Sequence, residues 1–365
     1  MVTGVDDFAA LGTIWRDLET RAEPSFFQSW TWTGCLAEQR FTDPVLIQVR
    51  DSGRIVALAL FNRRRGALHL GESGDPAKDC IYIEFNGVLA EAGREAAMTR
   101  VCLEAARSAS RWPILGRSGK PRLVLSGVAA QTVSSAREIG TAYRMASREC
   151  PFVDLVTSGS SFLETRHTNT RQQLRRSDRS YAASGDIAIG RAATVTEAVG
   201  CLDALRKLHQ AAWIARGRPG AFANPFFGSF HRALIERGLP RGEIDLLHVA
   251  AGDRTIGYLY NFWHRGKSLA YQSGFAYDDA NRREKPGLTC HHRSIRFAAD
   301  RGASRYEFLA GGDRYKRSLS DRADQLYWTE IGGRLSIRRV AAAVRDGFFR
   351  SGPDIARSGP DIEST

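Results

Sequence analysis

The chain has 365 residues, of which 43% are hydrophobic and 25% are charged. This composition is typical of an ordinary folded protein, and it excludes a disordered or a fibrous one. The length exceeds what a single hydrophobic core usually serves, so the sequence predicts two domains.

Positive charge is in excess, because 52 Lys and Arg residues outnumber 40 Asp and Glu residues and give a formal net charge of +12. A surface of this kind attracts anions. The candidate partners are an acyl-CoA, a nucleotide-sugar, a charged tRNA, an anionic glycan and a membrane surface. Net charge does not choose among them, and it serves solubility equally well.

The cysteines and the first residues of the chain indicate the cellular compartment in which the protein is expected. The six cysteines lie far apart with no CxxC pair, which predicts reduced thiols and no disulfide framework. The opening MVTGVDDFAALGTIW is acidic where a signal peptide is basic, and no stretch approaches 18 uninterrupted apolar residues. We therefore expect a cytoplasmic protein with no transmembrane segment, for which peripheral membrane contact stays open.

The first domain is predicted over residues 1–156. A helix is predicted for 24–39, and the segments PVLIQVR and RIVALALFNRR form a β-hairpin that turns at 51–53. Another helix is predicted for 91–110 and a strand for 122–126. The Gly-, Ser- and Ala-rich region that follows has no clear pattern, and the run TSGSS marks the domain boundary.

The second domain is predicted over residues 157–349. It contains three consecutive strands whose turns, Gly252–Asp253 and Gly266–Lys267, suit an antiparallel meander. The predicted helices are 162–183, one that ends near 216, 225–237, 288–300 and 335–348. The predicted strands are 187–191, 244–250, 255–264, 268–276, 305–310 and 325–331.

The last residues, 350–365, contain the hexapeptide RSGPDI twice in tandem. They are rich in Gly and Pro and poor in apolar residues, which predicts a disordered tail. A docking segment is the functional alternative.

The second half resembles the CelD/BcsL group of acetyltransferase-like proteins, which is itself similar to the FemABX aminoacyltransferases. The segments that carry the resemblance are, in order, RQQLRRSDR, LHQAAWIARGRPGAF, FHRAL, YQSGFAYDD, a loop with PGL, and EFLAGGDRYKR. In the first half, FFQSWTW is similar to the entry motif of the family. The resemblance implies tandem GNAT-like α/β domains with mixed, mostly antiparallel sheets.

The resemblance also implies an acyl-CoA site at the start of the helix that follows the meander. Main-chain N–H groups and the helix dipole attract a pyrophosphate there. In this chain the site falls on the loop 281–287, where Arg282, Arg283 and Lys285 add positive charge and Gly287 follows the turn. GNAT enzymes carry an Arg/Gln-x-x-Gly-x-Gly/Ala loop, whereas this loop has only one glycine, so a solvent-exposed basic turn is the alternative.

The last meander strand is predicted to flank the reacting carbonyl, because an acyl group in this fold pairs with exposed strand backbone. The residues concerned are Tyr271, Gln272, Ser273 and Gly274. Alternation along a strand puts Gln272 and Gly274 on one face and the other two on the opposite face. The pattern leaves open which face borders the site.

Three residues are predicted to carry the chemistry. In the pattern EFLxGxxxYK, Lys316 resembles the lysine that FemABX-like enzymes place near the acyl carbonyl, where a cation stabilises oxyanion charge. Tyr315 could donate a proton to the leaving group, and Glu307 could accept one from the amine. Asp313 and His231 are alternative bases. Among Glu307, Asp313 and His231, no residue stands out as the base.

The acceptor is predicted to contact basic and aromatic side chains. Arginines that recur every four residues form a cationic stripe on the basic helix, for which a solvated face is an equal alternative. An aromatic residue or a histidine on an amphipathic helix is more often part of the core. The predicted acceptor-binding residues are Trp30, Arg171, Arg175, Trp213, Arg216 and His231.

No metal is expected. Cys290, His291 and His292 are adjacent, and neighbouring helical residues point about 100° apart, so they do not converge on one ion. The chain also has no Walker loop, no Rossmann fingerprint after a strand, no GxSxG and no HExxH.

The sequence thus predicts an N-acyltransferase that uses acyl-CoA as co-substrate and acylates an amine, on a small molecule or a glycan precursor of the cell envelope or an exopolysaccharide. The polysaccharide machinery as partner comes only from the resemblance. One alternative is a FemABX-like transferase that uses aminoacyl-tRNA, although no coiled-coil insertion is visible. The other is a non-catalytic, nucleotide-binding regulator of polysaccharide synthesis.

Overall fold

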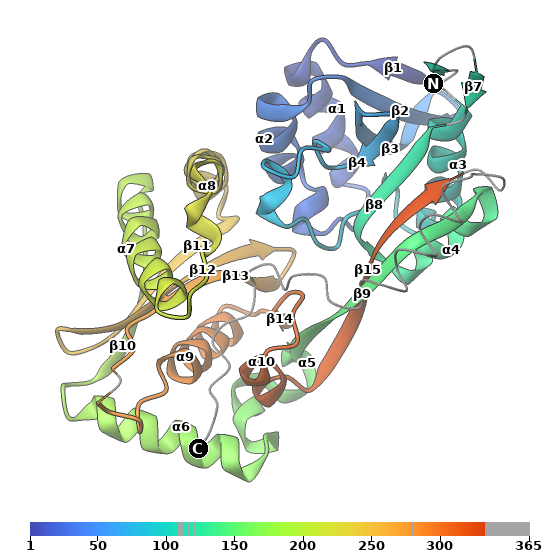
Figure 1. Ribbon diagram of the computed structural model, residues 1–365. Helices are drawn as coiled ribbons and strands as arrows, with labels where there is room; N and C mark the ends of the chain where they lie inside the picture. Colours follow the sequence, from blue (N-terminus) through green and yellow to red (C-terminus); the bar gives the residue numbers. More distant parts are fainter. Residues whose placement is uncertain (109–111, 115–116, 120, 279, 333–365) are drawn as a thin grey trace. The chain divides into compact units, whose positions relative to one another are not determined.

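The computed structural model describes residues 1–108, 112–114, 117–119, 121–278 and 280–332 (Figure 1). The chain divides into two compact units. Among the described residues, the first unit comprises 1–148 and 325–332, and the second comprises 149–324. The predicted helix at 335–348 and the predicted tail at 350–365 lie outside the described residues.

The first unit is an α/β domain built on one mixed sheet. Its helices are α1 (Phe8–Glu19), α2 (Trp30–Arg40), α3 (Glu95–Ser108) and α4 (Ala130–Ile139). Its strands are β1 (Val2–Gly4), β2 (Pro44–Asp51), β3 (Arg54–Arg64), β4 (Ala67–Leu70), β5 (Leu89–Ala90), β6 (Trp112–Ile114), β7 (Arg117–Gly119), β8 (Arg122–Ala129) and most of β15 (Arg322–Gly332). The strand order is β1-β2-β3-β4-β8-β15, with β4 and β8 parallel and the other pairs antiparallel.

Trp30 belongs to the interior of the first unit. Its side chain is 2% exposed and lies against Trp15, with the ring centroids 5.7 Å apart. Gly12 and Gly34 admit the ring, since a Cβ on either would come within 2.7 Å of ring atoms. Its predicted contact with an acceptor is replaced by packing between α1 and α2, because a large apolar ring on an amphipathic helix gains most free energy when it is buried.

The second unit is also an α/β domain with a mixed sheet. Its helices are α5 (Leu155–Ser158), α6 (Thr168–Ala182), α7 (Val195–Ile214), α8 (Pro225–Gly238), α9 (Pro286–Asp300) and α10 (Arg314–Leu319). Its strands are the second half of β9 (Thr141–Asp154), β10 (Ile187–Arg191), β11 (Ile244–Ala251), β12 (Arg254–His264), β13 (Lys267–Phe275) and β14 (Arg305–Glu307). The order is β9-β14-β13-β12-β11-β10, with β13 and β14 parallel and the other pairs antiparallel.

The two units repeat one topology. In each, a short strand and two helices precede a three-strand antiparallel meander, a helix and a strand parallel to the end of the meander. In each unit, the strand that follows the parallel pair in the sheet comes from a distant segment of the chain. In the first unit β15 pairs with β8, and in the second unit β9 pairs with β14. This confirms the predicted α/β fold with tandem domains and mixed, mostly antiparallel sheets.

The division between the units differs from the predicted boundary after residue 156. The chain leaves the first unit inside β9, at 148 and 149, and re-enters it inside β15, at 324 and 325. Local sequence patterns mark contiguous segments, whereas the pairing of β15 with β8 joins residues about 200 positions apart, such as Leu326 and Ala129. The run TSGSS lies in the second unit.

The predicted elements of the second half that fall within the described residues are confirmed, with small shifts at their ends. The basic helix begins at Thr168 and not at residue 162, because residues 159–165 form 3-10 turns and the His167 ring caps the first turn of α6. In the first unit the pattern does not predict β4 or most of β9. The exposed, polar first part of β9 has no hydrophobic period that would reveal it.

Candidate active site

The last meander strand, β13, has a neighbour along only part of one edge. On one side β12 pairs with it from Lys267 to Phe275. On the other side β14 pairs only with Lys267, Ser268 and Leu269. Within the described part of the chain, no strand continues that edge past Leu269. The main-chain groups on that edge of the second half of β13 are therefore not paired with a second strand.

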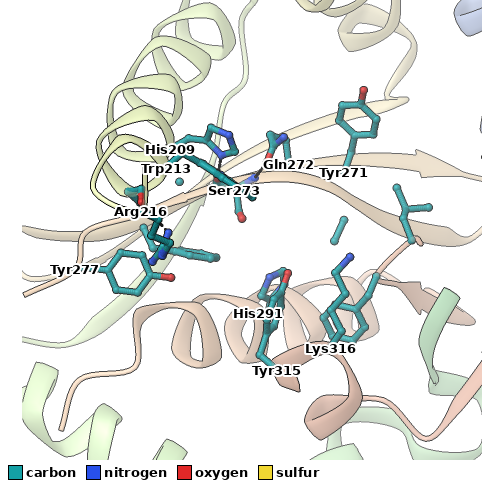
Figure 2. Close-up of a pocket in the computed structure, with 16 residues that line it drawn as sticks. His209, Trp213, Arg216, Tyr271, Gln272, Ser273, Tyr277, His291, Tyr315 and Lys316 are labelled. Carbon is teal, nitrogen blue, oxygen red and sulfur yellow. Dashed lines mark hydrogen bonds between the residues drawn. The ribbon is translucent and has the colours of Figure 1, made fainter. Parts of the chain in front are cut away.

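A pocket lies beside this open edge, entirely within the second unit (Figure 2). It is lined by the C-terminal end of α7, by residues 270–275 of β13, by Tyr277, by His291 of α9, and by Phe308, Leu309, Tyr315 and Lys316. Figure 2 shows His291, Tyr315 and Lys316 extending toward β13 from the opposite side of the pocket. The pocket thus brings together the predicted strand residues and two of the three predicted catalytic residues.

Ser273 has its main-chain groups at the open edge, and side chains occupy both. Its N–H donates to Oε1 of Gln272 across 3.0 Å. Its carbonyl oxygen accepts from Nδ1 of His209 across 3.1 Å. The predicted alternation of side chains does not hold here, because a register shift between Tyr260 and Asn261 leaves Tyr271 without a cross-strand partner. Figure 2 accordingly shows the side chains of Tyr271 and Gln272 on the same side of β13.

His209, which the sequence analysis did not single out, connects α7 to β13. Its other ring nitrogen, Nε2, accepts the main-chain N–H of Ala221 across 3.3 Å, so the ring proton lies on Nδ1 and is donated to Ser273. Burial lowers the pKa of His209 to about 4, which keeps the ring neutral near pH 7. A single histidine on a helix carries no sequence signal for such a role.

Lys316 is buried in the wall of the pocket, with 5% of its surface exposed. Its ammonium donates to the main-chain oxygen of Ala310 across 3.1 Å and lies 3.8 Å from the carboxylate of Asp313. A cation removed from water needs such partners. The structure therefore places the predicted lysine in the pocket as a fixed positive charge, and it assigns Asp313 as its counter-ion.

Tyr315 lies against His291, with the two rings stacked at a centroid distance of 5.1 Å. Burial raises the pKa of the Tyr315 hydroxyl well above its ordinary value, so the phenol keeps its proton at neutral pH. Burial and the charge of Lys316 lower the pKa of His291 to about 3. The pocket thus contains a phenol, a neutral imidazole and an ammonium group on neighbouring elements.

Two predicted acceptor residues, Trp213 and Arg216, also line the pocket. The Arg216 guanidinium lies 5.5 Å from the ring centroid of Tyr277, a cation–π contact at the exposed side of the pocket. Trp213 is buried next to His209, with ring centroids 5.7 Å apart. These residues give one side of the pocket an aromatic and cationic surface.

Glu307 and His231 do not themselves line the pocket. Glu307 forms an ion pair with Arg305 at 2.7 Å, and burial raises the pKa of its carboxyl group to about 7. His231 is completely buried on α8 and its Nε2 lies 3.1 Å from the hydroxyl of Tyr271. Both side chains are held in structural contacts, which accounts for two residues that the sequence analysis considered as bases.

The predicted anion loop and the basic helix lie outside the pocket lining as well. Arg282 and Arg283 are exposed, and the main-chain N–H of Lys285 donates to the Ser177 hydroxyl across 2.9 Å. Gly287 lies in the first turn of α9, and a Cβ there would be 3.3 Å from the ring of Phe275. Arg175 lies in a separate surface hollow on α6 with Arg176 and Arg179, and the Arg171 guanidinium donates to the Thr168 hydroxyl.

Among the described residues, no group of three or more His, Cys, Asp or Glu side chains could hold a metal ion. His291 and its neighbour His292 separate as predicted, since His291 contacts Tyr306 and Tyr315 whereas His292 lies near Asp178. No helix in the described segments is long and apolar enough to cross a membrane.

The open strand, the pocket and the buried lysine occur within the part of the chain that matches a known family. Residues 168–317 match the family model described as acetyltransferase (GNAT) domain. This match supports an acyltransferase enzyme that contains a GNAT acetyltransferase domain. The narrower resemblance to the CelD/BcsL group stays a prediction.

Solved structures agree with this fold. The chain is similar to FemX, with a TM-score of 0.59 and 9% identity over 90% of this chain and 96% of that one. It is also similar to the C-terminal domain of a protein described as a lysylphosphatidylglycerol synthetase from Agrobacterium fabrum, with a TM-score of 0.54 and 12% identity over 97% and 100% of the chains. The structure of L-PGS from Bacillus licheniformis is similar as well, with a TM-score of 0.54 and 11% identity over 91% of this chain and 95% of that one. No curated protein sequence matches this chain. At these identities the likeness concerns the fold alone.

Proposed function

We propose that this protein transfers an acyl group from an acyl-CoA thioester to a primary amine. One observation carries the proposal: the open edge of β13 and the buried ammonium of Lys316 border the same pocket. An extended acyl donor pairs with open strand backbone, and a fixed cation stabilises charge on its carbonyl oxygen.

The transfer has two steps. The amine nitrogen attacks the thioester carbon, the C–N bond forms, and the carbonyl π electrons move to oxygen, where Lys316 stabilises the negative charge. The intermediate then collapses: the C–S bond breaks, CoA leaves as a thiolate, and the nitrogen releases one proton to give the neutral amide. The phenol of Tyr315, which burial keeps protonated, lies in the same pocket and is positioned to donate a hydrogen bond to that thiolate, which takes up the proton released by nitrogen.

The phosphates of CoA would bind outside the pocket, at the start of α9. Arg282 and Arg283 are exposed there. The acceptor side of the pocket has Trp213 and the Arg216–Tyr277 pair, which suit a polar, partly anionic amine. We propose a glycan precursor of the cell envelope or an exopolysaccharide as that amine.

The experiment that tests this function measures release of free CoA thiol from acetyl-CoA and longer acyl-CoA in the presence of a panel of amino sugars and amines. Wild-type protein should release CoA in an amine-dependent reaction. Lys316→Ala should lower kcat by about 10²- to 10³-fold and leave the Kd of acyl-CoA within about threefold, because the cation acts on the developing charge.

Lys267→Ala is the matched control, since Lys267 is an exposed lysine on the same unit. It should keep the wild-type kcat. Absence of both acyl-CoA binding and CoA release from wild-type protein, across the whole panel, would rule out the thioester mechanism.

A second donor is favoured by one observation. The exposed arginines Arg175, Arg176 and Arg179 gather in a hollow on α6, a surface that suits a polyanion such as aminoacyl-tRNA. If tRNA is the donor, its affinity should fall steeply with salt and with replacement of these arginines. Acyl-CoA should then show no saturable binding.

A further inference from the structure

His291 lies at the centre of the pocket wall, and it has no role in the two steps described above. It is 2% exposed and sits in the first half of α9. Tyr315 stacks on one face of the ring, and Phe275 and Phe308 contact it edge-on at centroid distances of 5.8 and 5.3 Å. These contacts fix the orientation of the imidazole.

The protonation state of His291 follows from its neighbours. Nδ1 lies 3.1 Å from the hydroxyl of Tyr306. Burial raises the pKa of the Tyr306 phenol, a rise that Ser294 and Asn261 oppose, so the hydroxyl keeps its proton. We assign this hydroxyl as the donor to Nδ1, an arrangement in which the neutral ring carries its own proton on Nε2.

The Nε2 atom is buried and has no hydrogen-bond partner among the described residues. An unpaired buried donor is unfavourable, and buried polar groups in native proteins are almost always paired. A donor left unpaired in the wall of a substrate pocket is accounted for when the substrate supplies the acceptor. Lys316 lines the same pocket, and the charge of its ammonium lowers the pKa of His291.

We propose that the Nε2–H group of neutral His291 donates a hydrogen bond to the acyl oxygen, so that His291 and Lys316 together form the oxyanion site. This rests on the proposed acyl transfer. The C–N bond forms, the π electrons move to oxygen, and the oxyanion accepts hydrogen bonds from both groups. His291 keeps its proton throughout, and collapse of the intermediate breaks the C–S bond.

Neutral His291 beside the Lys316 ammonium is chemically more favourable than a protonated His291 in the same place. An imidazolium beside Lys316 would meet a like charge in a buried place, whereas a neutral N–H donor adds a directed hydrogen bond without repulsion. A neutral donor also does not protonate the attacking amine. The ring of His291 thus supplies direction, and Lys316 supplies charge.

The first test separates a donor from a space-filling ring. His291→Phe preserves the ring stack and removes the donor, and His291→Gln places an amide N–H near the position of Nε2. With acetyl-CoA and the amine that gives turnover, His291→Phe should lower kcat by about 10²-fold, and His291→Gln should stay within about tenfold of wild type. The Kd of acetyl-CoA should change by less than about threefold in both. His292→Gln, on the adjacent residue outside the pocket, is the control.

A readout other than rate is the C=O stretch of ¹³C-labelled acetyl-CoA bound to the protein. Donors lower this frequency, so the shift seen in wild type should shrink in His291→Phe and remain in His291→Gln. The ¹⁵N resonances of labelled wild-type protein provide a check that needs no variant to be active. They should show His291 protonated on Nε2, with His291→Gln identifying the signals.

The outcomes are distinct. If wild type transfers the acyl group and His291→Phe keeps full kcat and the full carbonyl shift, the donor role is wrong and the transferase function stands. Protonation on Nδ1, or equal loss of kcat in the Gln and Phe variants, overturns the donor role in favour of a base. No acyl transfer by wild type overturns both the function and this inference.

Discussion

The imidazole of His209 donates from Nδ1 to the main-chain oxygen of Ser273 across 3.1 Å. This bond connects α7 to the part of β13 that lacks a second strand among the described residues. It therefore substitutes for a cross-strand hydrogen bond at the edge where the acyl donor is proposed to bind.

Loss of this bond should destabilise the second unit. His209→Ala leaves a carbonyl oxygen without its donor and opens a cavity beside Trp213, so the free energy of unfolding should fall by about 2–4 kcal/mol in urea titrations. His248→Ala is the control, because His248 is half-buried on β11 and should cost about 1 kcal/mol or less. An equal fall in the free energy of unfolding of the two variants would show that the hydrogen bond to Ser273 makes no particular contribution to stability.

The pH dependence of stability should also involve His209. Its pKa is about 4 in the folded protein and 6.5 ordinarily, so the unfolded chain binds a proton first as the pH falls. The stability that neutral His209 contributes is complete above pH 6.5 and is lost as the pH falls toward 4. Between these values wild type should lose up to about 1.4 kcal/mol per pH unit more than His209→Gln. Urea unfolding at pH 7, 6 and 5 measures the difference, and parallel curves would contradict it.

Gly274 is required by the close approach of α7 to β13. A Cβ at this position would lie 2.3 Å from the main-chain oxygen of Leu205, which cannot rotate away as a side chain could. Gly274→Ala should therefore lower the free energy of unfolding by about 1–3 kcal/mol and weaken acyl-CoA binding by displacing the pocket wall. The measurements are thermal unfolding and calorimetry.

Gly200→Ala on α7 is the matched control for Gly274→Ala. Gly200 is an exposed helical residue with nothing within 4 Å of the added methyl group, so this change should stabilise the protein by about 0.5–1 kcal/mol. If both substitutions stabilise the protein, the close approach of α7 to β13 is not a constraint.

Glu307→Gln should leave catalysis intact, because Glu307 is paired with Arg305 and does not line the pocket. We expect kcat at pH 7 within about threefold of wild type. A loss of about 10²-fold would instead restore Glu307 as a base.

The same substitution should alter the pH profile of stability. Burial raises the pKa of Glu307 from 4.5 to about 7, so its favourable contribution is complete below pH 4.5 and is lost as the pH rises through 7. Unfolding free energies at pH 5 and 7.5 should differ less in Glu307→Gln than in wild type.

The double variant Arg282→Ala/Arg283→Ala should bind acyl-CoA more weakly, by about 3- to 30-fold at low salt. The effect should diminish as salt is raised, since both side chains are exposed. Arg175→Ala/Arg176→Ala removes the same charge from α6 and should leave the Kd nearly unchanged. Similar losses in the two double variants would indicate general attraction by a basic surface and no phosphate site at α9.

Local pattern in the sequence determined most of the second unit. The glycine turns at Gly252 and Gly266 delimit the meander, and periodic apolar residues mark α7, α8 and α9. The motif around Lys316 led to the pocket wall, because residues close in sequence are held close in space. The hairpin at 51–53 and the order of elements followed from the same short-range information, whereas the fold class followed from the family resemblance.

Only the tertiary structure decided how β9 and β15 complete the sheets and which side chains border the pocket. Strand pairing between distant segments leaves no period in either segment, so the exchange of these strands was not predictable from them. His209 and His291 acquire their roles from desolvation and from partners far along the chain, Ser273 and Tyr306. Trp30 and Glu307 were equally plausible site residues by type, and burial and an ion pair assigned them to the interior, because the free energy of a side chain depends on surroundings that the local sequence does not encode.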